Sequence, residues 1–245
     1  MAVANAKLFY IWNFFERITP TGFVASWRNA GNYVKQNKDF ISTQLHRNLD
    51  PNGTYKYVNH AAFDGLTFEG FMQVKPSEAW SEKMRKIPPE TVAYPGGYTE
   101  ICTNTGKPLA PWLPKDDSTT FIVTAFKVAD EKDAALQETF EKDWMASSGA
   151  GFILNSAPSE LGVAHCGLYK KFTPKPGLMY VLRAELTGAA EDSQPARDFL
   201  AKVRAFAYPK YFELVDAALY RPDAENIMFP DAGRKDLPEG FTYKP

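Results

Sequence analysis

The chain has 245 residues, of which 44% are hydrophobic, 14% aromatic and 23% charged; this is the composition of a folded globular protein and excludes a disordered one. Its 28 basic and 29 acidic residues give a formal net charge of -1, so we expect neither nucleic acid nor an anionic membrane as a partner. The two cysteines make no disulfide framework, and no stretch approaches the roughly 20 apolar residues of a membrane helix. We therefore expect a soluble, cytoplasmic protein.

The first elements of the chain are a predicted strand and a predicted helix. The continuous apolar run LFYIWNFF at 8–15 is typical of a strand that is covered on both faces. Apolar residues then recur at helical spacing from 23 to 34, and Thr21 stands where the N-cap of that helix is expected.

A β-hairpin is predicted over 39–63. The turn sequence DPNG at 50–53 separates two strand-like stretches, at 41–49 and 55–61, that are rich in aromatic and β-branched residues. A helical pattern over 66–86, interrupted by a proline, and a further strand over 98–102 complete the order β-α-β-β-α-β.

The second half of the chain repeats this order. Prolines and polar residues concentrate at 106–118 and predict an exposed linker between domains at 1–105 and 119–221, with a C-terminal tail at 222–245. The elements predicted after the linker are a strand at 120–128, a helix through 136–144, strands at 162–172 and 178–186, a helix through 199–206 and a strand at 211–220.

Two copies of β-α-β-β-α-β predict an α+β fold built from two ferredoxin-like units. Each unit places its helices on one face of a four-stranded antiparallel sheet and leaves the other apolar face to be covered. We expect the two sheets to cover each other within one chain, as an intramolecular α+β barrel. Such a chain would be a monomer or a weak homodimer.

The stretches FVASWRNAGNYVKQNKDFISTQLHRNL, YKYVNHAAFDGLTFEGF and PGGYTEI resemble the antibiotic-biosynthesis-monooxygenase-like group of the dimeric α+β barrel superfamily. The resemblance covers about 7–103, whereas the second half matches only in the order of its elements. The group includes cofactor-independent monooxygenases of aromatic polyketides, haem-degrading enzymes and small quinone-handling proteins. In its oxygenases a first-strand asparagine faces the cavity between sheet and helices, and Asn13 occupies that stretch.

The haem-degrading branch also carries a tryptophan just after the third strand and a histidine on the second helix. This chain has Phe63 at the first position and no histidine within 66–86. Both differences argue against haem. No dinucleotide or phosphate-binding motif occurs, and the three histidines show no metal-ligand spacing, so we expect neither a cofactor nor a metal.

Asn13 is the one polar side chain in its apolar run, so its amide must find a hydrogen-bond partner if the strand is buried. A ligand carbonyl, a dioxygen-derived group or a neighbouring backbone group would each serve. Trp27 and Phe63 are expected to shape the pocket together with Tyr57, although packing in the core is the more common role of such rings.

His46 and His60 are candidate proton carriers on the first hairpin. Their direction depends on the strand register, which a slip of one residue reverses, and placement on the surface is the more common outcome. An ungapped comparison of the two first strands sets Ala125 opposite Asn13, which predicts that only the first half kept a functional cavity.

The sequence thus predicts a barrel that binds a small apolar or aromatic molecule, with cofactor-independent monooxygenation as the reaction implied by the resemblance. Asn13 would then orient the substrate. The alternative is a non-catalytic ligand-binding or protein-interaction barrel, because the sequence assigns no general base.

Overall fold

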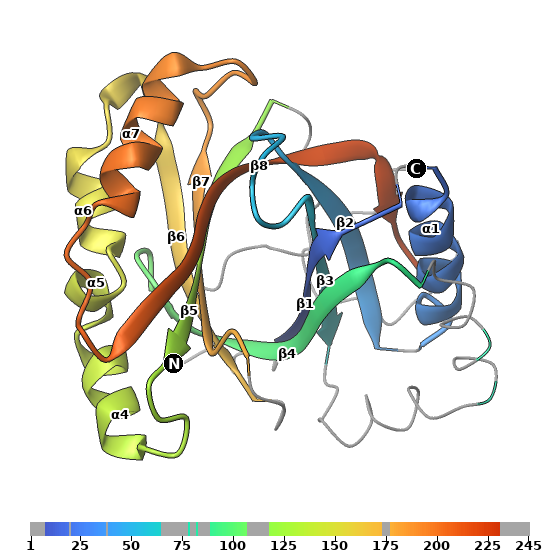
Figure 1. The fold of residues 1–245 in the computed structure, drawn as a ribbon, viewed down its shortest axis with the longest axis horizontal. Coiled ribbons are helices and arrows are strands. Elements are labelled where there is room, and N and C mark those ends of the chain that lie inside the picture. Colours follow the sequence, from blue (N-terminus) through green and yellow to red (C-terminus); the bar gives the residue numbers. More distant parts are fainter. Residues whose placement is uncertain are drawn as a thin grey trace, which may run out of the picture.

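The computed structural model describes residues 8–19, 21–37, 39–64, 78, 82, 89–106, 118–172 and 177–230. Within them, eight antiparallel strands close into one barrel in the order β1-β3-β2-β8-β5-β7-β6-β4, and β4 returns to β1 (Figure 1). The α+β class and the barrel are therefore as predicted.

The described strands follow the predicted order along the chain, while three short helices and a 3-10 turn stand between β5 and β6 where one helix was predicted. In the first half they are β1 (Leu8–Arg17), α1 (Phe23–Val34), β2 (Phe40–Asn48), β3 (Tyr57–Asp64) and β4 (Val92–Thr103). In the second half they are β5 (Thr120–Val128), α4 (Ala134–Lys142), α5 (Trp144–Ser147), α6 (Ala150–Ser156), a 3-10 turn (Ser159–Leu161), β6 (Val163–Lys171), β7 (Tyr180–Leu186), α7 (Gln194–Arg204) and β8 (Phe212–Met228).

Several boundaries differ from the predicted ones. Helix α1 is capped by Gly22, at φ 98°, and no side chain caps it, so Thr21 is not its N-cap. Strand β8 continues to Met228 instead of ending near 220, because its last residues pair with β2. The predicted helical region at 66–86 and most of the linker at 106–118 lie outside the described residues.

The strand order is the same in the two halves. The first four strands lie as β4-β1-β3-β2 and the last four as β8-β5-β7-β6, so each half places its first and third strands in the middle. Two further ladders, β2 with β8 and β4 with β6, join the halves and close the barrel. Each of the eight described strands therefore has a paired neighbour on both sides.

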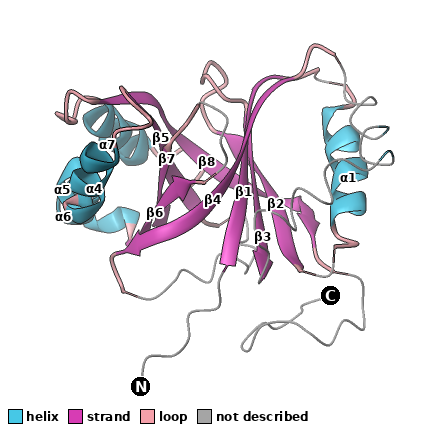
Figure 2. Ribbon diagram, turned by 90° about the horizontal axis from the view of Figure 1, so that it is seen from below, coloured by secondary structure: helices cyan, strands magenta, loops and turns pink. Residues whose placement is uncertain are grey.

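Each sheet has one face toward the barrel lumen and one toward helices. Helices α4 to α7 cover one outer side of the barrel and α1 covers the opposite side (Figure 2). Side chains alternate between the two faces along each strand. The lumen is filled by an apolar cluster drawn from all eight strands, which includes Tyr10, Trp12, Phe14, Ile41, Val58, Ala62, Tyr98, Phe121, Val123, Ala125, Tyr169, Val181, Ala218 and Tyr220.

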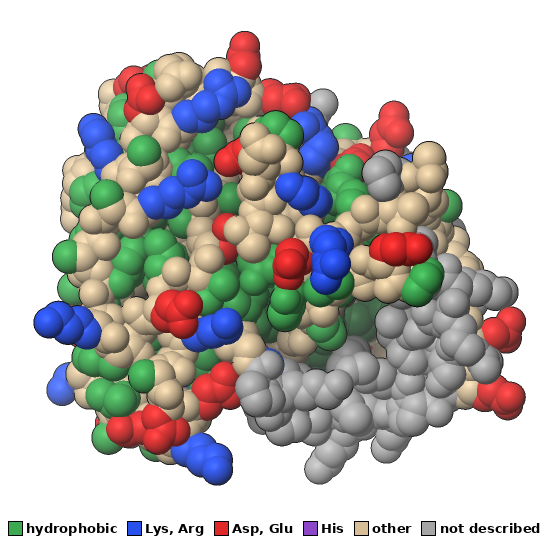
Figure 3. Space-filling model, in the orientation of Figure 1, with side chains coloured by type: hydrophobic (Ala, Val, Ile, Leu, Met, Phe, Trp, Pro, Cys, Tyr) green, Lys and Arg blue, Asp and Glu red, His purple; other side chains and the backbone are tan. Residues whose placement is uncertain are grey.

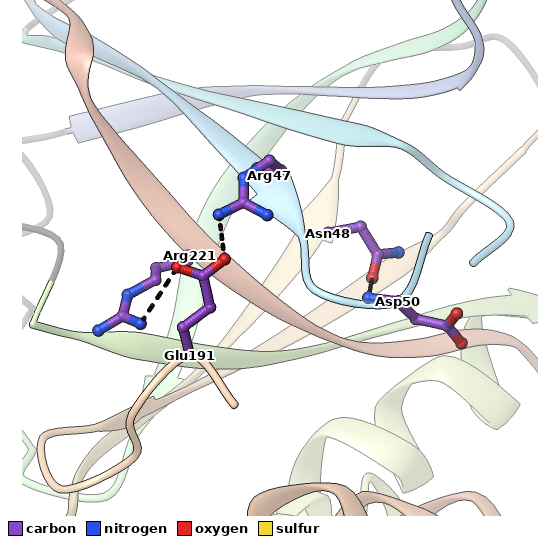
Figure 4. A network of polar contacts seen from close by, with 5 residues as sticks. All are labelled: Arg47, Asn48, Asp50, Glu191 and Arg221. Atoms are coloured by element: carbon purple, nitrogen blue, oxygen red, sulfur yellow. Dashed lines mark hydrogen bonds and ion pairs between the residues drawn. The ribbon is translucent and has the colours of Figure 1, made fainter. Parts of the chain in front are cut away.

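Local sequence explains how the hairpin and the second-half helices begin. Buried Asn48 donates from Nδ2 to the carbonyl of Tyr55 at 2.8 Å. Its Oδ1 accepts from the backbone N–H of Asp50 at 2.8 Å (Figure 4). These two hydrogen bonds stabilise the turn between β2 and β3. Asp133 accepts from the N–H of Leu136 and caps α4, and Ser193 caps α7 in the same way, as expected for these residue types.

An ion-pair network on the surface also connects the halves. Arg47 on β2 donates to Glu191 at 2.6 Å, and Arg221 on β8 lies 3.7 Å from the same carboxylate (Figure 4). Arg47 holds the pKa of Glu191 below its ordinary value. Acidic and basic side chains are interspersed over the face shown in Figure 3, in keeping with the net charge of -1.

Candidate functional site

The candidate site lies on the helix-facing side of the first-half sheet, where Asn13 is placed by strand alternation. Tyr10, Trp12 and Phe14 point into the lumen, whereas Phe9, Ile11 and Phe15 belong to clusters on the helix side. Asn13 falls between the latter and is partly exposed. Its side-chain amide has no hydrogen-bond partner among the described residues.

A second asparagine stands beside Asn13. Asn59 on β3 is its direct cross-strand partner, and such pairs carry their side chains on the same face. The Oδ1 of Asn59 accepts from Trp27 Nε1 at 2.9 Å and from Thr43 Oγ1 at 2.7 Å. These two bonds fix the rotamer of Asn59 and hold the ring of Trp27 against the sheet.

Aromatic clusters lie on either side of this polar row. One contains Phe63, which stacks on Phe9 with ring centroids 4.8 Å apart. The other contains Trp27, with Tyr57 packed against it and 5.2 Å from the ring of Phe23. The row of Asn13, Asn59 and Thr43 thus interrupts an otherwise apolar surface.

His46 and His60 do not join this site. Both rings point into the lumen. The ring centroid of His60 lies 4.4 Å from that of Trp12, and the ring centroid of His46 lies 5.5 Å from that of Phe121. They are buried, so placement on the surface, the more common outcome for such histidines, is wrong here. The register β1-β3 carries Asn13 and His60 on opposite faces of one sheet, and a ligand on Asn13 cannot touch either histidine.

Burial also decides the protonation of the two rings. Desolvation, aided by the positive charge of Arg183, lowers the pKa of His46 to about 3 and that of His60 well below its ordinary value of 6.5. Both are neutral at pH 7. They are therefore unable to shuttle protons by titrating near neutral pH.

Asn59 and Thr43 were missed by the sequence reasoning, although a signal for Asn59 was present. In the strand YVNHAAF, Asn59 shares its face with Tyr57 and Phe63 by the period of two, so it was open to the same argument as Asn13. Thr43 could not be found in this way, because a bulge between Phe40 and Ser42 shifts the register of β2.

The ungapped alignment sets Ala125 opposite Asn13, but the two residues occupy opposite faces of their sheets. Ala125 belongs to the lumen cluster, whereas Asn13 faces helices. Thr124 is the helix-facing neighbour, because it pairs with Leu182 and Ala217, which both belong to the helix-side core.

The described residues hold no group of three or more histidine, cysteine or acidic side chains that could bind a metal ion. All three histidines of the chain are among them, on β2, β3 and β6. None of the described helices is both long and apolar enough to cross a membrane. Burial raises the pKa of Cys166 to about 12, as expected of a structural thiol.

Comparison with solved structures shows where this fold occurs. An anthrone oxidase-like protein matches with a TM-score of 0.57 at 14% identity, over 93% of this chain and 95% of its own. TA0507, a candidate chlorite dismutase, matches with a TM-score of 0.52 at 13% identity, over 89% and 95%. A mutant chlorite dismutase from Candidatus Nitrospira defluvii gives a TM-score of 0.50 at 14% identity, over 89% and 92%. At these identities the likenesses show a shared fold and nothing further.

Sequence comparison supplies the family. No curated protein matches the chain. The sequence model described as a domain of unknown function, DUF7153, matches residues 40–208, which include β2 to β7. The chain belongs to the DUF7153 family.

Proposed function

We propose that this chain binds a small aromatic molecule on the helix-facing side of the first-half sheet and oxygenates it without a cofactor. One observation carries the proposal: the Asn13 amide is partly exposed, lies between two aromatic clusters and has no hydrogen-bond partner among the described residues. A polar group in such a place is seldom idle, because leaving it unpaired costs free energy.

The surroundings of Asn13 favour an aromatic ligand. Ile11 and Phe15 flank it on the same face of β1, and the stacked Phe9–Phe63 pair lies four residues along the strand. Asn59 adds a second amide whose orientation is fixed by Trp27. Ligand sites commonly combine such an apolar lining with a few fixed polar groups. A flat molecule with one or two ring oxygens matches that combination.

A hydroxylated polycyclic aromatic can supply the electrons for its own oxygenation. The substrate releases a proton to solvent, because no described residue at the site is assigned as a base, and this gives an anion whose charge is shared between a ring carbon and an oxygen. The carbanion form reduces O2, and the resulting peroxide takes a proton back from solvent before it loses water. A ring CH2 and O2 then become C=O and H2O, so that the atoms balance without flavin or metal. The Asn13 N–H would stabilise the anionic oxygen, as amide donors do in oxyanion sites.

We also infer that the two halves are ferredoxin-like repeats, with domains near 1–105 and 119–221. The support is the shared strand order, β4-β1-β3-β2 and β8-β5-β7-β6. Since the barrel closes within one chain, no partner is needed to pair an edge, and we expect a monomer or a weak homodimer. Size-exclusion chromatography with light scattering across a hundredfold range of concentration measures this directly.

Oxygen consumption tests the reaction. Purified protein is mixed with a panel of hydroxylated anthrones and naphthols in an oxygen electrode, without added flavin or metal, and binding is followed in parallel by fluorescence under nitrogen. We expect uptake above the uncatalysed rate with at least one compound. Asn13→Ala should lower turnover by about a hundredfold, the usual effect of removing one oxyanion donor.

Asn155→Ala is the matched control, because Asn155 is exposed on α6 in the other half and should behave as wild type. Binding that requires Asn13 without oxygen uptake would leave a ligand-binding barrel and refute the reaction. Neither binding nor uptake with any compound would refute the whole proposal.

A further inference from the structure

The end of strand β8 reaches the helix-facing surface of the first half, where the proposed aromatic site lies (Figure 1). Met228, its last residue, pairs directly with Thr43 on β2, so the two side chains lie on the same face of the sheet. Thr43 in turn donates to Asn59 at 2.7 Å. The polar row that begins at Asn13 on β1 therefore leads across β3 and β2 to Met228.

Met228 joins the two aromatic clusters of this surface. Its partly buried side chain packs against the cluster that contains Phe63 and also against the one that contains Trp27. A thioether suits such a place, because methionine is flexible and makes favourable contacts with aromatic rings. Since β8 belongs to the second half of the chain, a second-half residue forms part of the first-half site.

Helix α1 leaves room for this side chain at Gly31. The buried residues of the helix are Phe23, Trp27 and Gly31; the first two belong to one aromatic cluster, and Val34 packs on the other. A Cβ added at Gly31 would overlap the sulfur of Met228 and lie 2.8 Å from its Cε. The thioether therefore fills the space between the bare position on the helix and the end of the polar row.

The main chain next to Met228 is held from two sides. On one side it pairs with β2. On the other, Arg28 of α1 donates from Nε to Oδ1 of buried Asn226 at 2.7 Å and from Nη2 to the carbonyl of Glu225 at 3.3 Å. The side chain of Met228, and not its backbone, is therefore the part that can turn aside for a ligand.

We infer that Met228 is a specificity-determining residue of the proposed aromatic site, an inference that rests on the proposed function. Neighbouring strands lie about 4.8 Å apart, so three spacings, or about 14 Å, separate β1 from β8 along the polar row. A molecule of two fused rings that is anchored at Asn13 ends before Met228, whereas a molecule of three fused rings meets the thioether. The site therefore selects two-ring over three-ring substrates.

Dissociation constants for a naphthol and a hydroxyanthrone, measured by fluorescence under nitrogen, test this role. Met228→Ala should shift the ratio of the two constants about tenfold in favour of the hydroxyanthrone, the usual effect of a small change in the size of an apolar pocket. Gly31→Ala should shift the ratio the other way, because the new Cβ pushes the thioether toward the polar row. The double variant should match Met228→Ala, because the side chain that would be pushed is gone.

Met145→Ala is the matched control, because Met145 is also partly buried but packs on the second-half core, and it should keep the wild-type ratio. A ratio of two constants cancels any general loss of affinity or stability. Binding that requires Asn13, with the same ratio in wild type, Met228→Ala and Gly31→Ala, would overturn this inference and leave the proposed function standing. Failure of all these proteins to bind either compound would overturn both.

Discussion

The two helix-facing surfaces of the barrel differ in continuity. In the second half, 21 buried residues form one apolar cluster beneath α4 to α7, and Phe140 stacks on Phe212 at 3.9 Å within it. Among the described residues of the first half, which leave out most of 65–88, the corresponding surface carries clusters of five and four buried residues, with Asn13, Asn59 and Thr43 between them. One surface is organised for packing, and the other keeps polar groups in an apolar setting.

The difference indicates that the halves divide two tasks. A continuous core contributes most of the free energy of folding, since each buried aromatic side chain removes large apolar area from water. A core interrupted by amides is less favourable unless those amides are paired. The second half is therefore expected to carry stability, and the first half to carry recognition.

Truncation of a core ring should give the largest effect. Phe140→Ala removes a fully buried side chain from the second-half cluster and should lower the free energy of unfolding by about 3–5 kcal/mol. Asn13→Ala should change it by less than about 0.5 kcal/mol, because the amide is partly exposed and unpaired. Urea denaturation of both variants measures the contrast, and similar losses would show that the first half is also organised for packing.

The lumen shared by the halves should make stability depend on pH. Burial lowers the pKa of His46 to about 3 and that of His60 well below 6.5, so the unfolded chain binds protons that the native chain does not. The stabilisation is fully present above pH 6.5 and is lost as the pH falls, by up to about 1.4 kcal/mol per pH unit for each histidine. Asp216 offsets part of this, because burial raises its pKa to about 6 and its sign is opposite.

His46→Gln isolates one of these contributions. The slope of the free energy of unfolding between pH 6 and 5 should decrease by about 1.4 kcal/mol per pH unit relative to wild type. Thr124→Val carries no titratable group and should keep the wild-type slope. An unchanged slope in His46→Gln would mean that His46 is protonated in the native barrel.

Loss of the Asn59 acceptor should have an intermediate effect. Asn59→Ala leaves Trp27 Nε1–H without its acceptor and leaves the Thr43 hydroxyl with only the long contact to the His60 carbonyl at 3.4 Å, and we expect a loss of about 1–3 kcal/mol. In the Trp27→Phe background the same change should cost less, because one of the two donors is already absent. Additive losses would show that the hydrogen bond contributes little to the first-half layer.

Much of the fold was predictable because local patterns agree with it. The turn at 50–53 separates β2 from β3 as expected, and β5 spans the residues predicted for it, since apolar runs and turn residues are local signals. The end of β8 was not predictable. Residues 222–228 contain a proline and charged residues, and they are held as strand by pairing with β2, a partner far away in the sequence.

The candidate site was predictable only in part, because a residue type does not tell which face of a sheet it occupies. Asn13 could be placed from its apolar neighbours, whereas His46 and His60 required the register. They pack against rings on other strands, and the charge of Arg183 on β7 acts on them electrostatically, and no local pattern contains that information.

The smallest effects should come from one substitution made in both halves, and they should have opposite signs. Thr43 and Thr124 are buried on the helix-facing sides, but Thr43 donates to Asn59 whereas the Thr124 hydroxyl has no partner. Thr43→Val should lower the free energy of unfolding by about 1 kcal/mol, and Thr124→Val should raise it by about as much, because a buried unpaired hydroxyl is replaced by a methyl group of similar shape. Thermal unfolding of the pair measures both. Equal signs would contradict the division between a paired polar row in the first half and a packed core in the second.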